Sequence, residues 1–280
     1  KTAYEIRNCD WSSDVCSSDL SQPYTKVTKP TGMHIQGVTV LKSQCYVALQ
    51  DGSQQSIASL DKSKLELQVQ DSSKIDGDSI ADLTSSENRG LLAWISTANA
   101  NPRVALWAPS KTVKPVLDHA ANLKASPDGL IATGPSMAGR AVFHLETGTP
   151  VLVPGSERDE VFDIAEDTKQ VWLLARQGAT SGLWSLTKGT SALVVDIKSA
   201  SHPRSLVTLT STSGGARAAA FQTDTTTMWA GSNAANFHGA TSSDMDKGCA
   251  AKRFCVVGTN AFFAARSLSL GVEPWHWWAD

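Results

Sequence analysis

Two short apolar runs, Gly90-Leu-Leu-Ala-Trp-Ile-Ser96 and Arg103-Val-Ala-Leu-Trp107, establish the architecture of this chain. Both runs are rich in Leu, Ile, Val and Trp. The segment between them, Asn99–Pro102, holds Asn and Pro residues that favour turns. Apolar runs of this length on either side of a turn signal predict a pair of antiparallel β-strands.

The same arrangement recurs along the chain, each pair following the previous one after about 36 to 49 residues. A period near 40 is typical of a radial or stacked β array, most often a β-propeller. The other five pairs are Gln44–Leu49 with Ser56–Leu60, Gly129–Thr133 with Arg140–Leu145, Gln170–Arg176 with Ser181–Leu186, Ala218–Thr223 with Thr226–Trp229, and Asn260–Ala265 with Gly271–Trp275.

Further strands are expected around these hairpins. Four segments that follow a hairpin have strand character: Lys64–Val69, Lys114–Leu117, Pro150–Val153 and Ala192–Ile197. Two segments that precede one also do: Leu206–Leu209 and Phe254–Val257. Four strands per repeat make a propeller blade. We therefore predict an all-β fold, a propeller of about six four-stranded antiparallel blades. The stretches 198–217 and 230–248 are expected to be mainly long loops.

The last repeat is expected to lack its outer strand, because only five residues follow Trp275. We expect Tyr24-Thr-Lys-Val27 to supply that strand and to close the ring. This interpretation leaves open that the chain is a fragment of a longer propeller.

Tryptophan residues recur at one position of the repeat. Trp107, Trp184, Trp229 and Trp275 are expected to fill the gap between adjacent blades, each burying about 150–250 Å². Two repeats have Phe143 and Ala58 at this position, and the Ala58 repeat is expected to pack most loosely.

Two segments carry a resemblance to known repeats. Ala125-Ser-Pro-Asp-Gly-Leu-Ile-Ala-Thr133 with Phe143-His-Leu-Glu-Thr-Gly148 resembles a WD-type blade. The segment Ala261–Trp275 resembles a bacterial repeat family with a Glu-Leu-Trp-x-x-Asp-Gly-Thr signature, although His276–Asp280 departs from it. The resemblance implies a bacterial, often exported propeller, placed in the periplasm, at the cell surface or outside the cell. It assigns no catalytic residue.

The first 20 residues resemble an in-frame translation of a short-read sequencing adapter. We interpret 1–20 as an assembly artefact and 21–280 as the propeller domain; the alternative is a genuine N-terminal segment. Without the 2 basic and 4 acidic residues of 1–20, the 25 basic and 27 acidic residues of the chain become 23 of each.

The charge is balanced and the chain has no basic stripe, so we expect no nucleic-acid partner. No apolar run approaches the roughly 20 residues of a membrane helix. We expect a monomer without a cofactor.

Cys249 and Cys255 are the candidate disulfide, with five residues between them in a segment that could form a hairpin. In an exported protein such a bond would hold a long loop. The alternatives are two unpaired thiols, or a zinc site for which His238 is the one nearby additional ligand.

Asp76, Asp78 and Asp82 cluster around a glycine and form a candidate calcium site, because calcium prefers oxygen ligands. Their spacing is not that of an EF-hand, so the alternative is a solvated loop between blades. The histidines are scattered along the chain, and no pair of them is expected to act together: His34, His119, His144, His202, His238 and His276.

These observations favour a non-catalytic propeller, an interaction or structural module with an unidentified protein or glycan partner. The alternative is a propeller enzyme, a hydrolase or lyase acting on a lactone or glycan at the channel mouth. A concave site that collects two or more Asp, Glu, His or Arg side chains would favour the enzyme.

Overall fold

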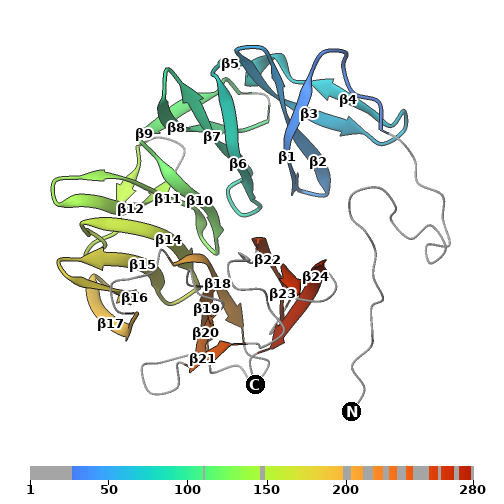
Figure 1. Ribbon diagram of the computed structural model, residues 1–280. Helices are drawn as coiled ribbons and strands as arrows, with labels where there is room; N and C mark the ends of the chain where they lie inside the picture. Colours follow the sequence, from blue (N-terminus) through green and yellow to red (C-terminus); the bar gives the residue numbers. More distant parts are fainter. Residues whose placement is uncertain are drawn as a thin grey trace.

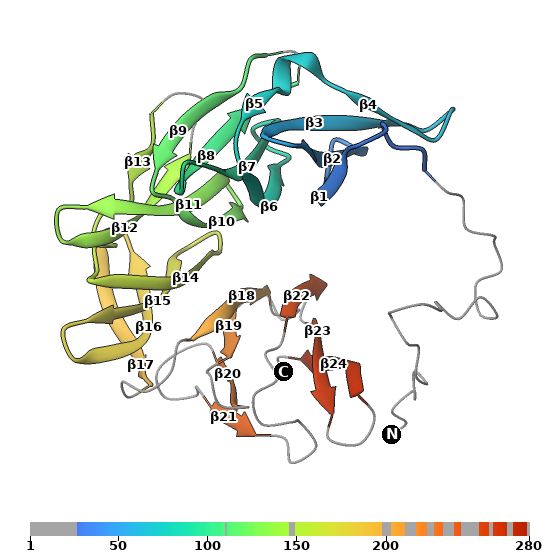
Figure 2. The same ribbon diagram turned by 45° about the horizontal axis from the view of Figure 1, so that its top comes forward.

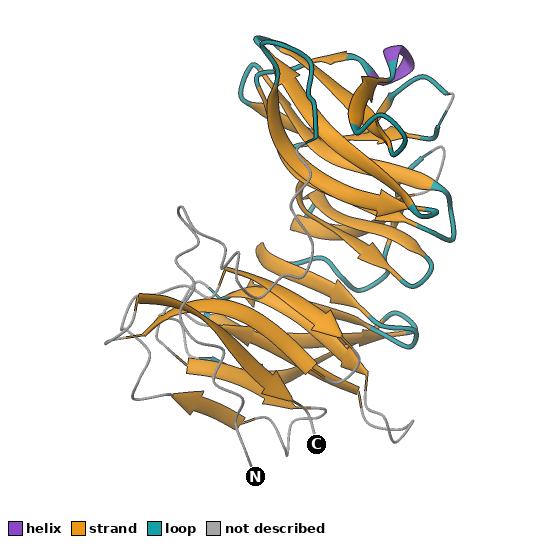
Figure 3. Ribbon diagram, turned by 90° about the vertical axis from the view of Figure 1, so that its right-hand side faces the viewer, coloured by secondary structure: helices purple, strands orange, loops and turns teal. Residues whose placement is uncertain are grey.

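The computed structural model describes residues 27–109, 111–145, 149–197, 203–210, 217–222, 227–231, 238–241, 252–257, 260–267 and 271–278. In this part the chain forms six antiparallel sheets that radiate around a common centre (Figure 1). Strands dominate, and the helix in the described part is the three-residue 3-10 turn η1 (Asp71–Ser73) (Figure 3). No helix there could cross a membrane.

Each sheet is built from consecutive strands in chain order. The first sheet contains β1 (His34–Leu41), β2 (Gln44–Asp51), β3 (Gln54–Asp61) and β4 (Glu66–Val69), and β5 (Ile75–Asp76) pairs with β3. The second contains β6 (Ser79–Ser86), β7 (Leu91–Ala98), β8 (Asn101–Trp107) and β9 (Lys114–Asp118). The third contains β10 (Ala121–Ser126), β11 (Gly129–Ser136), β12 (Gly139–Leu145) and β13 (Val151–Leu152).

The remaining three sheets repeat this order. The fourth contains β14 (Glu160–Glu166), β15 (Val171–Gln177), β16 (Thr180–Thr187) and β17 (Thr190–Asp196). The fifth contains β18 (Arg204–Thr210), β19 (Arg217–Gln222), β20 (Thr227–Gly231) and β21 (His238–Thr241). In the sixth, the described strands are β22 (Lys252–Val257), β23 (Asn260–Ser267) and β24 (Gly271–Trp278).

The first strand of each sheet lies nearest the centre, and successive first strands contact one another in the order β1, β6, β10, β14, β18, β22 (Figures 1 and 2). This is the architecture of an all-β propeller, as predicted. The six predicted hairpins are confirmed as the pairs β2–β3, β7–β8, β11–β12, β15–β16, β19–β20 and β23–β24.

Several strands were not predicted from the sequence. The inner strands β1, β6, β10 and β14 have polar or mixed sequences without clear alternation, so their local pattern is weak. The interpretation of the segment around Asp76, Asp78 and Asp82 as a loop was wrong at β5, which holds Asp76, and at β6, which holds Asp82. The loop prediction for 230–248 was wrong at β21, which pairs with β20.

The inner strands share a second repeated feature, a register irregularity near their N-terminal ends. A β-bulge bends a strand and redirects its side chains. The shifts lie between Ile35 and Gly37, Ala81 and Leu83, Ala121 and Lys124, Val161 and Asp163, Arg204 and Val207, and Lys252 and Cys255.

The core lies between the sheets, because successive residues of a strand face opposite neighbours. In β7, Leu92 and Trp94 pack toward the first sheet, whereas Leu91, Ala93 and Ile95 pack toward the third. All five side chains are buried. The burial of Leu91, Leu92 and Ile95 contributes about 1.5–3 kcal/mol of hydrophobic stabilisation for each side chain.

The aromatic position of the repeat faces the preceding sheet. Trp107 packs against the first sheet, Phe143 against the second and Trp184 against the third. Trp107 is buried, whereas Trp184 is half-buried. Trp229 and Trp275 lie on β20 and β24, and their side chains are outside the described part.

Ala58 faces away from the second sheet. An aromatic side chain in its place would therefore lie on the face of the first sheet that does not pack against the second. Ala58 itself is fully buried, together with Val47 and Leu49. On the same face, Val38 and Val40 of β1 are 59% and 53% exposed. Loose packing on this side is therefore found at β1 and not at Ala58.

The predicted closing strand includes Tyr24–Lys26, which lie outside the described residues. Val27 belongs to no strand, and Thr28 forms a parallel bridge with Glu66 of β4. The Thr28 amide donates to the Leu65 carbonyl at 2.8 Å. The described chain after the predicted strand thus borders the first sheet and not the sixth.

Candidate functional site

A pocket of about 340 Å³ opens between the first and second sheets. The β-sheet register places alternate side chains of β2, β3 and β4 on one face, with Tyr46 opposite Ser59 and Ser59 opposite Gln68. The wall formed by the first sheet comprises Gln44, Tyr46, Ser59, Asp61, Gln68 and Gln70. This outer part of the face lies where neighbouring blades diverge.

Two aromatic rings close the inner end of the pocket. Tyr46 and Trp107 meet edge to face, with ring centroids 5.8 Å apart and planes at 76°. Trp107 is 1% exposed, and its indole N–H donates to Ser72 Oγ at 3.3 Å. Burial raises the pKa of the Tyr46 hydroxyl. Because the ring of Trp107 is covered, it offers no open face on which a sugar could stack.

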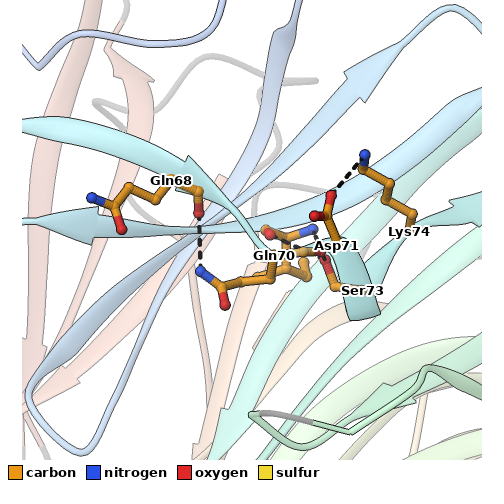
Figure 4. A network of polar contacts seen from close by, with 6 residues as sticks. Gln68, Gln70, Asp71, Ser73 and Lys74 are labelled. Carbon is orange, nitrogen blue, oxygen red and sulfur yellow. Dashed lines mark hydrogen bonds and ion pairs between the residues drawn. The ribbon is translucent and has the colours of Figure 1, made fainter.

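Glutamine side chains line the mouth, and their amide nitrogens are engaged within the protein. Gln44 Nε2 donates to the Leu60 carbonyl at 2.6 Å. Gln70 Nε2 donates to the Gln68 carbonyl at 3.1 Å (Figure 4). The same nitrogen donates to Ser59 Oγ at 2.9 Å. These bonds hold the glutamines against the wall.

Asp61 is the carboxylate of the pocket wall. Its Oδ2 accepts from Gln68 Nε2 at 2.9 Å, and its Oδ1 accepts from the hydroxyl and the amide of Ser63 at 2.6 and 2.9 Å. The Ser63 hydroxyl and then its amide lower the pKa of Asp61, with a smaller contribution from Lys64. Asp61 is therefore a fixed negative charge at neutral pH.

The calcium candidates remain a prediction. Asp76 lies in β5 and pairs with Gln54, while Asp78 Oδ2 accepts from the Asn99 amide at 2.8 Å in the β7–β8 turn. The side chain of Asp82 is outside the described part. Among the described side chains, no group of three His, Cys, Asp or Glu could hold a metal ion.

The cysteine candidates also remain a prediction. Cys249 lies outside the described residues, and Cys255 lies in β22 with its side chain not described. The same applies to His238 of the alternative zinc site, at the start of β21.

The structure brings together His144 and Glu166, an ionisable pair that the sequence did not indicate. His144 Nε2 of β12 lies 3.5 Å from Glu166 Oε1 of β14. Desolvation raises the pKa of Glu166, opposed by His144 and reinforced by Asp128 and Asp167. The two residues come from different repeats, so no local motif could have revealed them.

A second polar cluster lies at the centre of the propeller, where its side chains bond to one another and to the backbone. Lys124 Nζ lies 2.7 Å from Asp163 Oδ1 and donates to the Leu206 carbonyl at 2.8 Å. Asp163 Oδ2 accepts from the Leu206 amide at 2.7 Å, and Oδ1 also accepts from the Ile164 amide at 2.8 Å. Both carboxylate oxygens are therefore occupied, which leaves Asp163 unsuited to act as a general base.

Comparison with known proteins supports the fold. No protein-family model matches the chain, and no curated protein sequence does. A structure from a study of two prolyl endopeptidases is 12% identical and matches with a TM-score of 0.61 over 88% of this chain and 39% of that one. This chain therefore spans about two fifths of the length of that protein.

Two further structures are similar. The β-propeller domain of the Trilobed protease from Pyrococcus furiosus, described as having an open velcro topology, is 10% identical with a TM-score of 0.58 over 83% of this chain and 75% of that one. PorZ, a surface component of the type-IX secretion system of Porphyromonas gingivalis, is 11% identical with a TM-score of 0.52 over 89% of this chain and 33% of that one. At these identities the similarity shows the fold alone, an all-β propeller.

Proposed function

We propose that this chain is a non-catalytic propeller module that binds its partner in the pocket between the first and second sheets. The observation that carries the proposal is the composition of that pocket. Its wall combines amides, a serine and one anchored carboxylate, Asp61, around a buried aromatic end. Such a concave site with a few placed polar groups suits ligand recognition.

An enzymatic role would require an acid, a base or a nucleophile in contact with a bound substrate. In the part of the chain that the structure describes, Lys124 and Asp163 are engaged in linking sheets. The His144–Glu166 pair has acid–base character but does not line the pocket. We therefore favour binding over a hydrolase or lyase acting on a lactone or glycan.

We further infer that the module is exported and acts as a monomer on a protein or glycan partner. The support for export is the resemblance of Ala261–Trp275 to a bacterial repeat family found in exported proteins. Cell fractionation with an antibody to the native protein would test the location.

The binding proposal is tested by screening the chain against a peptide and glycan array, together with a blocked variant. Ser59→Trp places an indole across the pocket, and we expect it to abolish binding to the ligands that the wild type retains. Lys169→Ala, a substitution at an exposed turn of the fourth sheet, serves as the control and should bind normally. Equal binding by Ser59→Trp and the wild type would show that the pocket is not the site.

A further inference from the structure

We propose that the pocket between the first and second sheets takes an organic cation, an ammonium or guanidinium group of the kind carried by lysine and arginine side chains. This ligand class rests on the proposed binding function and specifies what the pocket selects. It follows from which polar atoms the wall leaves unpaired.

The orientation of the glutamine amides is set by partners that can only accept. The Leu60 carbonyl, the Gln68 carbonyl and the Asp61 carboxylate have no hydrogen to donate. The group that faces each of them must therefore be an NH2: that of Gln44 at 2.6 Å, of Gln70 at 3.1 Å and of Gln68 at 2.9 Å. Flipping any of these amides would place two acceptors against each other.

The amide oxygens of the same three glutamines remain available. Gln44 Oε1, Gln68 Oε1 and Gln70 Oε1 accept no hydrogen bond from the described residues. The lining thus contains three amide oxygens that no described residue pairs. A ligand rich in N–H groups can donate to them.

The charge of the pocket lining also favours a cation. Asp61 lies on the wall, and no lysine, arginine or histidine is among the residues that line the pocket. Two bonds from Ser63 and one from the Lys64 amide at 3.2 Å hold the carboxylate in place, so it needs little reorganisation to meet a cation. The positive charge of Lys64 acts on Asp61 and reduces the attraction for a bound cation, but Lys64 does not line the pocket.

The alternatives fit less well. An anion would meet acceptors and a like charge. A neutral sugar would find no open aromatic face, because Trp107 is 1% exposed. An ammonium carries three donors and no acceptor, and a guanidinium carries five donors. The volume of about 340 Å³ accommodates such a head group and part of its aliphatic stem.

The test is a titration of the isotope-labelled chain followed by NMR, with the indole N–H of Trp107 as the reporter at the inner end of the pocket. The cationic probes are the blocked tripeptides Ac-Gly-Lys-Gly-amide and Ac-Gly-Arg-Gly-amide, and free cadaverine. The matched probes carry norleucine or glutamate at the central position, and maltotriose represents a neutral sugar. If the tripeptides bind more tightly than cadaverine, the cation comes from a protein side chain. If cadaverine binds more tightly than the tripeptides, the cation is a free amine.

We expect the lysine and arginine probes to bind at least about fivefold more tightly than norleucine, an advantage that weakens with added salt. Asp61→Asn should reduce this preference about fivefold, and Lys64→Gln should increase it about twofold. Thermal unfolding of both variants verifies that they are folded.

These measurements distinguish failure of the cation assignment from failure of the proposed binding function. The cation assignment is overturned if the norleucine, glutamate or maltotriose probe binds as tightly as the lysine and arginine probes or more tightly, or if Asp61→Asn leaves the preference unchanged. In that case the proposed binding function still stands, provided that Ser59→Trp blocks the binding that is observed. If no probe and no array ligand shifts the Trp107 signal, both the cation assignment and the proposed function are overturned.

Discussion

Lys124 and Asp163 are joined at the centre of the propeller, with Nζ 2.7 Å from Oδ1. Lys124 belongs to β10 and Asp163 to β14, and both bond to the backbone of Leu206 in β18. One ion pair therefore links three neighbouring sheets. Asp163 is 5% exposed, and these hydrogen bonds and the ion pair offset the cost of burying its carboxylate.

Replacing Asp163 should be costly. Asp163→Leu leaves the Leu206 amide without its acceptor and Lys124 without its counter-charge, and we expect a loss of about 2–4 kcal/mol in the free energy of unfolding. Urea denaturation followed by tryptophan fluorescence measures it. Lys169→Met, which removes an exposed lysine, is the control and should stay within about 0.5 kcal/mol of the wild type. A stability equal to that of the control would show that the central pair contributes nothing.

Two serines hold equivalent strands in the first and third sheets. Ser73, which is drawn in Figure 4, accepts through Oγ from the Ile57 amide at 2.8 Å. Ser156 Oγ accepts from the Val142 amide at 3.0 Å. Both serines are fully buried. We expect Ser73→Ala and Ser156→Ala each to destabilise by about 1–3 kcal/mol, because each leaves a buried amide unpaired.

The measurement for the serine pair is the urea midpoint at constant slope. Ser53→Ala, in an exposed turn, is the matched control and should be neutral. Loss of stability in one variant but not the other would refute the equivalence of the two positions.

The pKa of Glu166 predicts a pH dependence of stability. Burial raises this pKa above its ordinary value of 4.5, so the folded state holds a proton that the unfolded state has released. Between the unfolded and the folded pKa the native state binds more protons, and stability therefore falls as pH rises. Above the folded pKa this contribution is absent.

Glu166→Gln removes this dependence. The variant should gain stability relative to the wild type as pH increases from the unfolded pKa through the folded one, with His144, Asp128 and Asp167 unchanged. Urea denaturation of both proteins between about pH 4 and about pH 8 gives the difference. A difference that is flat, or that shrinks with rising pH, would contradict the raised pKa.

Arg158 is buried over the ring of Trp184, with Cζ 4.5 Å from the ring centroid. Its guanidinium donates to the Gly155 carbonyl at 3.0 Å, to the Glu157 carbonyl at 2.5 Å and to Ser191 Oγ, and burial lowers its pKa. A lysine cannot reproduce this planar set of bonds. We expect Arg158→Lys to cost about 1–3 kcal/mol in unfolding free energy.

The control for this substitution is Arg176→Lys, whose ion pair with Glu160 at 2.9 Å is half exposed. It should cost less than about 1 kcal/mol. Both variants are compared by thermal unfolding and by the tryptophan emission of the native state, which should change in Arg158→Lys alone. Equal effects of the two substitutions would show that stacking on Trp184 adds no stability.

The sequence predicted the hairpins well, because a strand–turn–strand unit is encoded within some 20 contiguous residues. The runs Gly90–Ser96 and Arg103–Trp107 carry both their apolar content and their turn, and the structure pairs them in register. The inner strands β18 and β22 were predicted through Leu206–Leu209 and Phe254–Val257, whereas β1, β6, β10 and β14 escaped prediction because the requirement for an apolar run is relaxed at the centre. Ala121-Asn-Leu-Lys-Ala-Ser126 is an example, with a bulge that further hides its period.

The candidate site escaped prediction for a different reason. The pocket wall draws Gln44, Asp61 and Gln70 from three separate segments, and none of these residues stands in a recognisable motif. The pairs Lys124–Asp163 and His144–Glu166 likewise join different repeats. Their partners are chosen by the packing of one sheet on the next.

Local pattern was therefore sufficient for the repeat, the hairpins and the fold class, since these depend on neighbours along the chain. Tertiary structure alone decided which side chains meet between sheets, and so where the pocket lies and which acceptors it exposes. The physical reason is that the sheets are covalently joined only in series, whereas their faces interact through side chains some 40 residues apart. The glutamine amides acquire their orientation once β2, β3 and β4 pair, and the pocket forms once Trp107 of the second sheet packs against them.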